Sequence, residues 1–470
     1  MRTAAVFFRR FGAGSKSLNA EALSSLIVAN KPKLSVVKQI HAFLLAGGTL
    51  THSLPLLNNL IRCYSLSEFP FLSVFLYKQA LLSPPSFNSF TFTFLVNGCT
   101  NSCNTIHLGN QLHSLTIKMG FGVHVYVQTA LVSLYCVGGF LDCAQHLFDE
   151  IPNKNIVTWN AIITGFAKMG YLNRAFDLFN KMPFRNVISW TGLIDGFVRM
   201  RQYVGSFKLF RRMASCEAIK PNEITLLAIM PAISLWGDSI LCGVVHCYAE
   251  KRGFVVLDTR VANSILESYS KCGCIESALQ FYHEIPMIKR SLVSWTTMIS
   301  GLAMHGMGDD AIGLFREMET IDLKPNDVTF LSVMNACSHG NLVTEGLMFF
   351  EKMRKEYDIE ANIKHYGCVV DMLARVGRLE EAEKIALEIP QGIANDIVWR
   401  TILGACSVHG DAAVGERAMK KLMEIERSYG GDYILMHNLF VGNKKFNEAE
   451  KLRNLMDERN ASKLCGRSFV

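Results

Sequence analysis

The residues with the widest chemical repertoire in this chain are its fourteen cysteines, and their spacing does not build a metal or redox site. No C-x-x-C pair is present. Cys272 and Cys274 form a C-x-C, and Cys99 and Cys103 lie four residues apart. Structural zinc sites need paired ligands at short, fixed spacings. We therefore expect buried free thiols that act as small hydrophobic side chains in a reducing compartment, with no bound metal.

The remaining composition excludes several classes of function. The sequence shows no nucleophile beside a base, no glycine-rich phosphate loop and no set of metal ligands, so we expect no catalytic residue and no cofactor. The net charge of +7 over 470 residues favours an anionic partner only weakly. No apolar run approaches the roughly 20 residues that a membrane-spanning helix needs, which predicts a soluble protein without a membrane partner.

A block of about thirty-five residues returns along most of the chain, and it must position whatever chemistry is present. Its clearest copies are YCVGGFLDCAQHLFDEIP from Tyr135, FAKMGYLNRAFDLFNKMP from Phe166, YSKCGCIESALQFYHEIP from Tyr269 and LARVGRLEEAEKIALEIP from Leu373. A period of this size indicates a solenoid in which each repeat packs only on its neighbours. The length of the chain therefore does not imply several globular domains.

One repeat, Ile156–Asn186, shows the expected local structure. Apolar residues at helical spacing predict a first helix from about Thr158 to Lys168, which Gly170 ends. A second apolar face predicts a helix from Leu172 to Met182, which Pro183 closes. Neither helix could bury its apolar face alone. The sequence thus predicts an all-α fold, a right-handed superhelical α-solenoid of helix–turn–helix repeats.

Tryptophan gives an independent measure of the register. Trp159, Trp190, Trp295 and Trp399 all fall early in a predicted first helix, and only Trp236 falls outside this register. We expect the four aromatic side chains in register to pack between adjacent repeats, in the core.

These two markers divide the chain into ten complete repeats with lengths of 31 to 36 residues. In chain order, repeats 1 to 10 are Leu54–Asn88, Ser89–His124, Val125–Asn155, Ile156–Asn186, Val187–Asn222, Glu223–Asp258, Thr259–Ser291, Leu292–Asn326, Asp327–Asn362 and Ile363–Asn395. A degenerate repeat is expected at residues 21–53, and a helical tail at residues 396–470.

The repeats resemble the plant pentatricopeptide repeat (PPR) family, in its subclass with alternating P, long and short motifs. The resemblance covers about Leu18 to the C-terminus and is carried by VTWNAIITGFAKMG, VSWTTMISGLAMHG, GNQLHSLTIKMGF and HYGCVVDMLARVGRLEEAEKI. The W-x-x-L-G-x-x-Y pattern of tetratricopeptide repeats is absent. The resemblance implies an array that reads single-stranded RNA, one base per repeat.

The tail narrows the subclass. Asp396–Gly430 is similar to the first E motif of that family, the residues from Gly431 onward are similar to the second, and KLCGRSFV resembles the closing K-x-P-G-x-S-W. Arg427 and Cys465 replace prolines of the family pattern, and Phe469 replaces a tryptophan. The H-x-E and P-C-x-x-C signatures of a zinc cytidine deaminase are both absent from the sequence. The resemblance therefore implies an E-type protein that has no deaminase site of its own.

In this family two residues of each repeat contact the base, namely the fifth residue and the last residue. Six repeats carry small polar side chains at both positions, and the pairs are Asn58/Asn88, Thr129/Asn155, Asn160/Asn186, Thr191/Asn222, Asn263/Ser291 and Thr296/Asn326. The resemblance implies that Thr with Asn selects adenine and that Asn with Asn or Ser selects a pyrimidine, mostly cytosine. With the RNA running 5′ to 3′ along the protein from its N- to its C-terminus, the implied readout from repeat 1 is pyrimidine, any base, adenine, pyrimidine, adenine, any base, cytosine, adenine and two unassigned bases.

The same residue types have a structural interpretation, because Asn, Thr and Ser are favoured N-caps of helices. Capping therefore stays open as the role of any single pair. Leu227 and Leu331 occupy the fifth position of repeats 6 and 9 and cannot hydrogen-bond a base edge, which predicts that these repeats act as spacers. Two further pairs are ambiguous, Thr93/His124 and Gly367/Asn395.

Two other sets of side chains have alternative roles. The second residue of several repeats is apolar and would sandwich the base by resemblance, or else be buried against the next repeat; these residues are Pro55, Tyr126, Val157, Ile188 and Val293. Basic residues near the end of the first helix would contact phosphate, or else be solvated at a helix end; these are Lys168, Arg199, Lys271 and Arg375.

The first twenty residues have a different character from the repeats. They contain Arg2, Arg9, Arg10 and Lys16 and no acidic residue, which is typical of an organellar transit peptide. The arginine pair before Phe11 favours the mitochondrion, with the plastid as the alternative.

The resemblance implies a site-recognition factor for organellar C-to-U RNA editing. Such a factor binds single-stranded organellar RNA, not DNA, and recruits a deaminase-bearing PPR protein and other editing factors in trans. The alternatives are an organellar factor for RNA splicing, stability or translation, and a helical-repeat scaffold for protein–protein contacts. Alternating repeat lengths and the E-type tail favour the editing factor over the splicing, stability or translation factor. A scaffold has no need of the six polar pairs.

Overall fold

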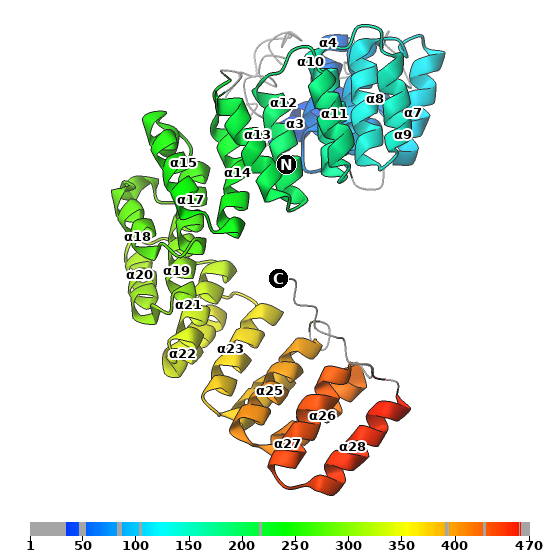
Figure 1. The fold of residues 1–470 in the computed structure, drawn as a ribbon. Coiled ribbons are helices and arrows are strands. Elements are labelled where there is room, and N and C mark those ends of the chain that lie inside the picture. The colour runs from blue at the N-terminus through cyan, green and yellow to red at the C-terminus, as the bar shows by residue number, and fades with distance from the viewer. Residues whose placement is uncertain are drawn as a thin grey trace. The chain divides into compact units, whose positions relative to one another are not determined.

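The computed structural model describes residues 34–46, 53–81, 87–102, 106–215, 219–390, 393, 395–425, 429–459 and 461. The expected transit peptide at residues 1–20 lies outside the described residues, and so does most of the expected degenerate repeat at 21–53. The chain forms two compact parts, Met1–Ile229 and Met230–Val470, which are described separately (Figure 1).

Helices are the only regular elements in the described part of the chain. The first helices of the repeats and of the tail are α4 (Leu54–Ser65), α6 (Ser89–Thr100), α8 (Val125–Val137), α10 (Ile156–Lys168), α12 (Val187–Arg199), α14 (Glu223–Trp236), α17 (Thr259–Lys271), α19 (Leu292–Met304), α21 (Asp327–His339), α23 (Ile363–Arg375), α25 (Asp396–His409) and α27 (Gly430–Gly442). The second helices are α5 (Leu72–Ala80), α7 (Ile106–Lys118), α9 (Leu141–Glu150), α11 (Leu172–Lys181), α13 (Tyr203–Ser215), α15 (Ser239–Lys251), α18 (Ile275–Glu284), α20 (Gly308–Thr320), α22 (Val343–Lys355), α24 (Leu379–Glu388), α26 (Ala412–Ile425) and α28 (Phe446–Glu458). Three further elements are α3 (Leu34–Ala46), α16 (Phe254–Leu257) and the 3₁₀ turn η1 (Met287–Lys289).

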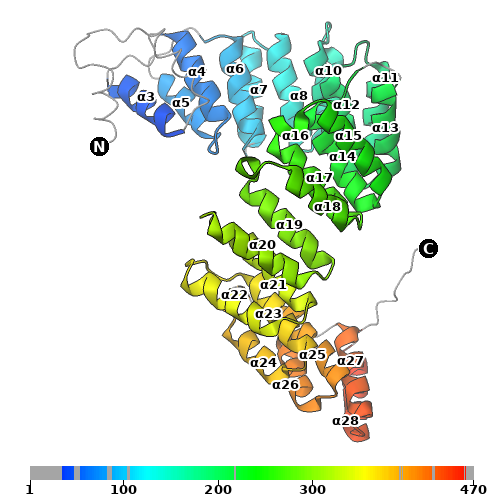
Figure 2. The same cartoon turned by 90° about the vertical axis from the view of Figure 1, so that its left-hand side faces the viewer.

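Within each part the helices form two layers. In the first part, α4, α6, α8, α10 and α12 pack on one another in chain order, and each first helix also packs on the second helix of its own repeat. In the second part, α17, α19, α21, α23, α25 and α27 do the same, and this order can be followed in Figure 2. The predicted all-α solenoid of helix–turn–helix repeats is confirmed.

Repeat 4 shows how closely the sequence predicts the helix ends. Its first helix begins at Ile156, not near Thr158, because the Asn155 side chain caps the helix and the chain turns helical directly after it. The helix is followed by Gly170 with φ of +86°, a left-handed conformation that glycine adopts without strain. The predicted end at Gly170 is therefore confirmed, and the predicted start is wrong by part of a turn.

Three of the four tryptophans in register are buried as predicted, Trp190, Trp295 and Trp399, whereas Trp159 is half-buried. Trp190 and Trp295 are fully buried. Each packs edge-on against an aromatic ring of the preceding second helix, Trp190 against Phe179 with ring centroids 4.7 Å apart and Trp295 against Tyr282 at 5.6 Å. Within each part, these contacts join neighbouring repeats across their interface.

The predicted role of the cysteines is confirmed for those that lie on the inner faces of helices. Cys136, Cys242, Cys337, Cys368 and Cys406 are buried free thiols, and burial raises the pKa of each to about 12. Such thiols are unreactive near neutral pH because little thiolate forms. Among the described residues, no three His, Cys, Asp or Glu side chains gather in a way that could hold a metal ion.

In the ranges that the structure describes, every helix is too short or too polar to cross a bilayer.

A histidine–tyrosine hydrogen bond recurs at three junctions between repeats. In each, a histidine Nδ1 on a second helix, or on α3, bonds the hydroxyl of a tyrosine on the next first helix; the pairs are His41/Tyr64 at 3.0 Å, His113/Tyr135 at 2.8 Å and His246/Tyr269 at 3.0 Å. Burial lowers the pKa of all three imidazoles. The neutral form of each histidine is therefore the one that fits the folded chain.

We expect these junctions to weaken in mild acid. An imidazole whose folded pKa is lowered contributes no pH dependence above its ordinary value of 6.5, and it destabilises the fold as the pH drops below that value, because the unfolded chain takes up the proton more readily. Hydrogen exchange of α7 and α8 at about pH 7.5 and about pH 5.5 measures this loss. His113→Gln keeps an amide that can bond Tyr135 but does not titrate, so it should remove the local pH dependence; an unchanged dependence would contradict the assignment.

Candidate nucleic-acid interface

The last residue of each of the six predicted base-reading repeats caps the next first helix. Asn155 Oδ1 accepts a hydrogen bond from the backbone nitrogen of Thr158 at 2.9 Å. The equivalent bond is made by Asn88, Asn186, Asn222, Ser291 and Asn326, at 2.9 to 3.3 Å. The capping interpretation is confirmed, and it also fixes the orientation of each amide. A backbone N–H can only donate, so Oδ1 is the accepting atom and Nδ2 remains for another partner.

The fifth residue of each of these repeats reaches the same place from the first helix of its own repeat. Asparagine amides donate directly to the last residue, and the bonds are Asn58–Asn88 at 3.1 Å, Asn160–Asn186 at 3.4 Å and Asn263–Ser291 at 3.3 Å. Threonine hydroxyls instead bond a hydroxyl of the following repeat, and the bonds are Thr129–Thr158 at 2.8 Å, Thr191–Thr225 at 2.7 Å and Thr296–Thr329 at 2.8 Å. The structure therefore brings the two residues of every predicted pair into one polar cluster.

A third residue completes each cluster, and the repeat pattern alone does not single it out. It is the third residue of the following repeat and always carries a hydroxyl; the set is Thr91, Thr158, Ser189, Thr225, Ser294 and Thr329. These side chains are 0 to 1 % exposed. We call the fifth residue of one repeat, its last residue and the third residue of the next repeat a polar triplet.

The sequence contains a signal for this third position. Where the preceding repeat was predicted not to read a base, or was ambiguous, the hydroxyl is missing; the residues are Val127, Val261, His365 and Val398 after repeats 2, 6, 9 and 10. His365 shows the difference, because its two ring nitrogens bond the backbone of Asn362 and Asp327 and its side chain is completely buried. A hydroxyl at the third position thus follows each of the six repeats with a predicted base-reading pair, and it is absent after repeat 2 although the fifth residue there, Thr93, is polar.

The second residues of the repeats form an exposed apolar stripe, so the alternative in which they are buried against the next repeat is wrong. Tyr126, Val157, Ile188 and Val293 are 58 to 63 % exposed. Pro55 is also exposed. Tyr126 stacks on Phe90, the second residue of repeat 2, with ring centroids 5.8 Å apart and ring planes 29° apart. These side chains are free to contact the faces of a planar ligand.

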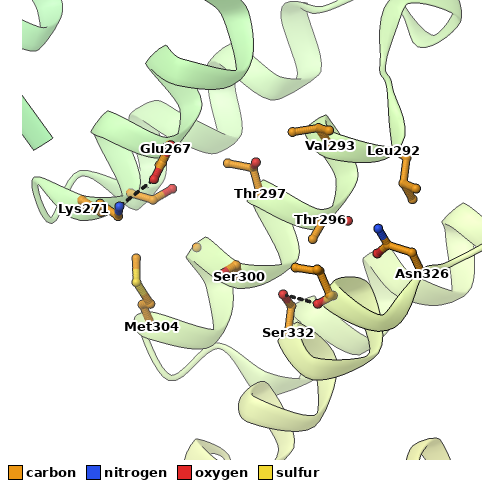
Figure 3. A pocket seen from close by; sticks show the side chains of 13 residues that line it. Glu267, Lys271, Leu292, Val293, Thr296, Thr297, Ser300, Met304, Asn326 and Ser332 are labelled. Atoms are coloured by element: carbon orange, nitrogen blue, oxygen red, sulfur yellow. Dashed lines mark hydrogen bonds and ion pairs between the residues drawn. The ribbon is translucent and has the colours of Figure 1, made fainter. Parts of the chain in front are cut away.

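One polar triplet opens into a pocket of about 340 Å³ in the second part of the chain. Figure 3 shows Val293, Thr296 and Asn326 around it, with Thr297 and Ser300 from the same helix α19. Val328, the second residue of the next repeat, also lines the pocket. The volume lies within the range of sites that hold small ligands. Two apolar side chains and a polar pair with an available amide suit a flat, hydrogen-bonding ring.

Most of the basic side chains predicted to contact phosphate have an acidic partner. Arg199 bonds Asp195, one helical turn earlier, at 2.7 Å. Lys271 and Arg375 pair in the same way with Glu267 and Asp371. Lys168 has Thr164 at that place and is exposed. For Arg199, Lys271 and Arg375, the alternative of a solvated helix end therefore fits well, because exposed ion pairs of this kind contribute little to stability.

Comparison with known families gives matches along the array and the tail. Residues 154–187 and 290–339 match the PPR repeat family, and residues 129–156, 188–217, 261–288 and 328–357 match the PPR repeat. Residues 409–470 match the E motif. The matched segments fall within residues 129–357 of the array and within the tail.

Two curated proteins of Arabidopsis thaliana illustrate the similarity. A mitochondrial pentatricopeptide repeat-containing protein is 50 % identical over 464 residues, which covers 95 % of this chain and 92 % of that protein. The chloroplastic pentatricopeptide repeat-containing protein ELI1 is 38 % identical over 431 residues and covers 92 % of this chain and 67 % of its own length.

Solved structures show the same fold. The crystal structure of the pentatricopeptide repeat protein PPR10 from maize has a TM-score of 0.58 and 16 % identity, and the match covers 98 % of this chain and 76 % of PPR10. PPR10 in complex with an 18-nt psaJ RNA element has a TM-score of 0.55 and 14 % identity, covering 96 % of this chain and 81 % of PPR10.

Proposed function

The chain belongs to the pentatricopeptide repeat family, and from this premise we propose that it binds single-stranded RNA in a sequence-specific way. The observation that carries the proposal is the recurrence of the polar triplet in six repeats, each with an amide or hydroxyl left for a further partner. The exposed stripe of second residues provides apolar surface beside the triplets. Single-stranded bases present both their edges and their faces to such a surface.

The hydrogen-bonding groups of the triplets favour particular bases. In repeats 1 and 4, each asparagine at the fifth position already donates one N–H to the last residue, whose own Nδ2 is available. Such a site offers mainly N–H donors, and the Watson–Crick edge of cytosine presents adjacent acceptors at N3 and O2. Threonine at the fifth position replaces a donor by a hydroxyl, which suits a base with both a donor and an acceptor, as adenine has.

For the biological role, we infer site recognition in organellar C-to-U RNA editing. The E motif in the tail supports this role. A deaminase-bearing PPR protein and other editing factors would act in trans. The similarity to a mitochondrial relative and the basic N-terminal segment favour the mitochondrion, although a chloroplastic relative also matches most of the chain. Comparison of organellar transcripts from plants with and without the protein tests the role, and unchanged editing of every cytidine would contradict it.

The proposed readout is tested by RNA binding. The probe is a single-stranded RNA that carries, from its 5′ end, pyrimidine, any base, adenine, pyrimidine, adenine, any base, cytosine and adenine at successive positions. The competitor has guanine in place of the third and fifth bases, which face repeats 3 and 5. We expect at least about tenfold weaker binding of the competitor, since each well-formed base contact contributes about 1–3 kcal/mol. Equal affinities would exclude this register.

The apolar stripe should contribute affinity without sequence preference. Val293 is 58 % exposed beside the pocket of repeat 8. Val293→Ser removes apolar surface that would cover the face of a base. A loss of about 40 Å² of buried apolar area corresponds to about 1 kcal/mol, or roughly fivefold in affinity. The loss should be the same for adenine and guanine at the eighth position. Val204→Ser is the control, because Val204 is 49 % exposed on the second helix α13; equal losses in both variants would contradict a role for the stripe.

A further inference from the structure

The buried hydroxyl of each polar triplet has no surface on which to touch RNA, yet in five of the six triplets it bonds both side chains that are proposed to do so. Resting on the proposed function, we infer that the third residue of the following repeat is a positioning residue that determines base specificity. It sets whether the fifth residue donates or accepts a hydrogen bond toward the base. Repeat 8, with Thr296, Asn326 and Thr329, shows the arrangement most clearly.

The hydrogen bonds around Thr329 leave one arrangement of protons. Thr329 Oγ1 lies 2.8 Å from Asn326 Oδ1, which can only accept, so the single hydroxyl proton of Thr329 points there. The backbone nitrogen of Asn326 donates to Thr329 Oγ1 at 3.4 Å. Thr296 Oγ1 lies 2.8 Å from Thr329 Oγ1 and therefore supplies the proton of that bond. Thr296 is left with lone pairs only.

This arrangement gives the pocket a fixed polarity. Thr296 presents an acceptor, and Asn326 presents the two N–H donors of its Nδ2. Adenine fits this order, because its N6 amino group donates and its N1 accepts. Guanine presents the reverse order at the equivalent positions, O6 as an acceptor and N1–H as a donor. The buried hydroxyl thereby selects an amino purine over a keto purine.

Asparagine at the fifth position is oriented by the same device. Thr91 Oγ1 donates to Asn58 Oδ1 at 2.7 Å, and Ser294 Oγ donates to Asn263 Oδ1 at 2.7 Å. With the oxygen engaged, each asparagine can offer only N–H toward a base. Repeat 4 differs, since Ser189 donates to Asn186 and Asn160 Oδ1 has no hydrogen-bond partner. Repeats 1 and 7 should therefore discriminate between bases more strongly than repeat 4.

The test uses the full chain and two RNAs that differ only in adenine or guanine at the eighth position. Thr329→Val has nearly the same shape but lacks the hydroxyl, so the Thr296 proton is released and the Thr296 hydroxyl can donate or accept. We expect the wild-type preference for adenine to be about tenfold or more and to fall at least fivefold in Thr329→Val, with guanine binding tighter than before. Thr329→Ser retains the hydroxyl and should restore the preference.

The control is Thr116→Val, the same change at a fully buried hydroxyl that bonds only the backbone oxygen of His113 at 2.7 Å on α7. It should lower thermal stability and leave the adenine-to-guanine ratio unchanged. An unchanged ratio in Thr329→Val, or equal weakening for both RNAs, would overturn the inference while the proposed function stands. A wild-type chain that does not distinguish the two RNAs would overturn the proposed function and this inference together.

Discussion

Asn155→Asp is expected to change the preference of repeat 3 from adenine to guanine. Asn155 Oδ1 is occupied by the backbone nitrogen of Thr158 at 2.9 Å and by its hydroxyl at 3.0 Å, so Nδ2 is the group available to a base. In Asn155→Asp, one carboxylate oxygen still accepts the two hydrogen bonds from Thr158. The other oxygen takes the place of Nδ2 and its N–H donors. That oxygen accepts from N1–H and N2–H of guanine and repels N1 of adenine. Guanine O6 still faces the lone pairs of Thr129, but two hydrogen bonds to a charged carboxylate outweigh that repulsion. We expect a change from about tenfold in favour of adenine to about tenfold in favour of guanine.

The substitution should leave the fold intact, because aspartate is as good an N-cap as asparagine and a negative charge is favourable at a helix start. Binding is measured by fluorescence anisotropy with RNAs that carry each of the four bases at the third position. Asn153→Asp is the matched control, because Asn153 is exposed in the preceding loop and this substitution adds the same negative charge. Asn153→Asp should weaken all RNAs slightly and equally. A similar shift in both variants would mean that charge, and not the orientation of the amide, sets the preference.

The repeat pattern predicted most of the fold because every repeat must bury the same apolar faces. The helix layers, the buried tryptophans and the glycine turn after Lys168 all follow from spacing and residue size. The start of α10 was misplaced, because apolar periodicity weakens in the first turn, where Val157 is exposed, and the capping role of Asn155 decides the boundary.

The polar pairs were predicted from a family resemblance, and the structure adds the reason for their residue types. Asparagine, serine and threonine serve as caps and as candidate base contacts through different atoms of the same side chain. The third residue was missed because a threonine such as Thr158 inside a helix start looks like an ordinary capping-box residue. Its second role depends on a side chain about thirty residues earlier, which only the packing of adjacent first helices brings near.

The exposed second residues show where residue type alone misleads. An apolar side chain in a first helix is usually buried, yet Val157 and Ile188 are more than half exposed. Their position directly after the cap places them at the edge of the helix layer. Conversely, Arg199 looked available for phosphate in the sequence and is engaged by Asp195. Which charges are paired depends on the rotation of each helix, which the sequence pattern fixes less tightly than it fixes the core.

Arg400→Ala is expected to abolish editing activity while RNA binding is retained. Arg400 occupies the fifth position of the first tail helix, α25, and its Nε bonds both carboxylate oxygens of Asp432 on α27 at 3.0 and 3.1 Å. It also pairs with Asp396, and its guanidinium lies over the ring of Tyr429 at 4.3 Å. The side chain of Asp432 is only 3 % exposed. Removing one partner of such a buried pair typically costs about 3–5 kcal/mol, so α27 should detach from α25.

The destabilisation caused by Arg400→Ala should remain in the tail, because each repeat of a solenoid is coupled mainly to its neighbours. Affinity for the RNA probe should stay within about twofold of wild type, hydrogen exchange of α27 should rise, and editing in a complemented mutant plant should be lost. Lys421→Ala is the control, because Lys421 and Glu424 on α26 are both about half exposed where they pair at 2.9 Å, and exposed pairs contribute about 0–1 kcal/mol. Normal editing with a detached α27 would show that the tail is dispensable. Weaker RNA binding together with lost editing would place the tail in RNA recognition and not in recruitment.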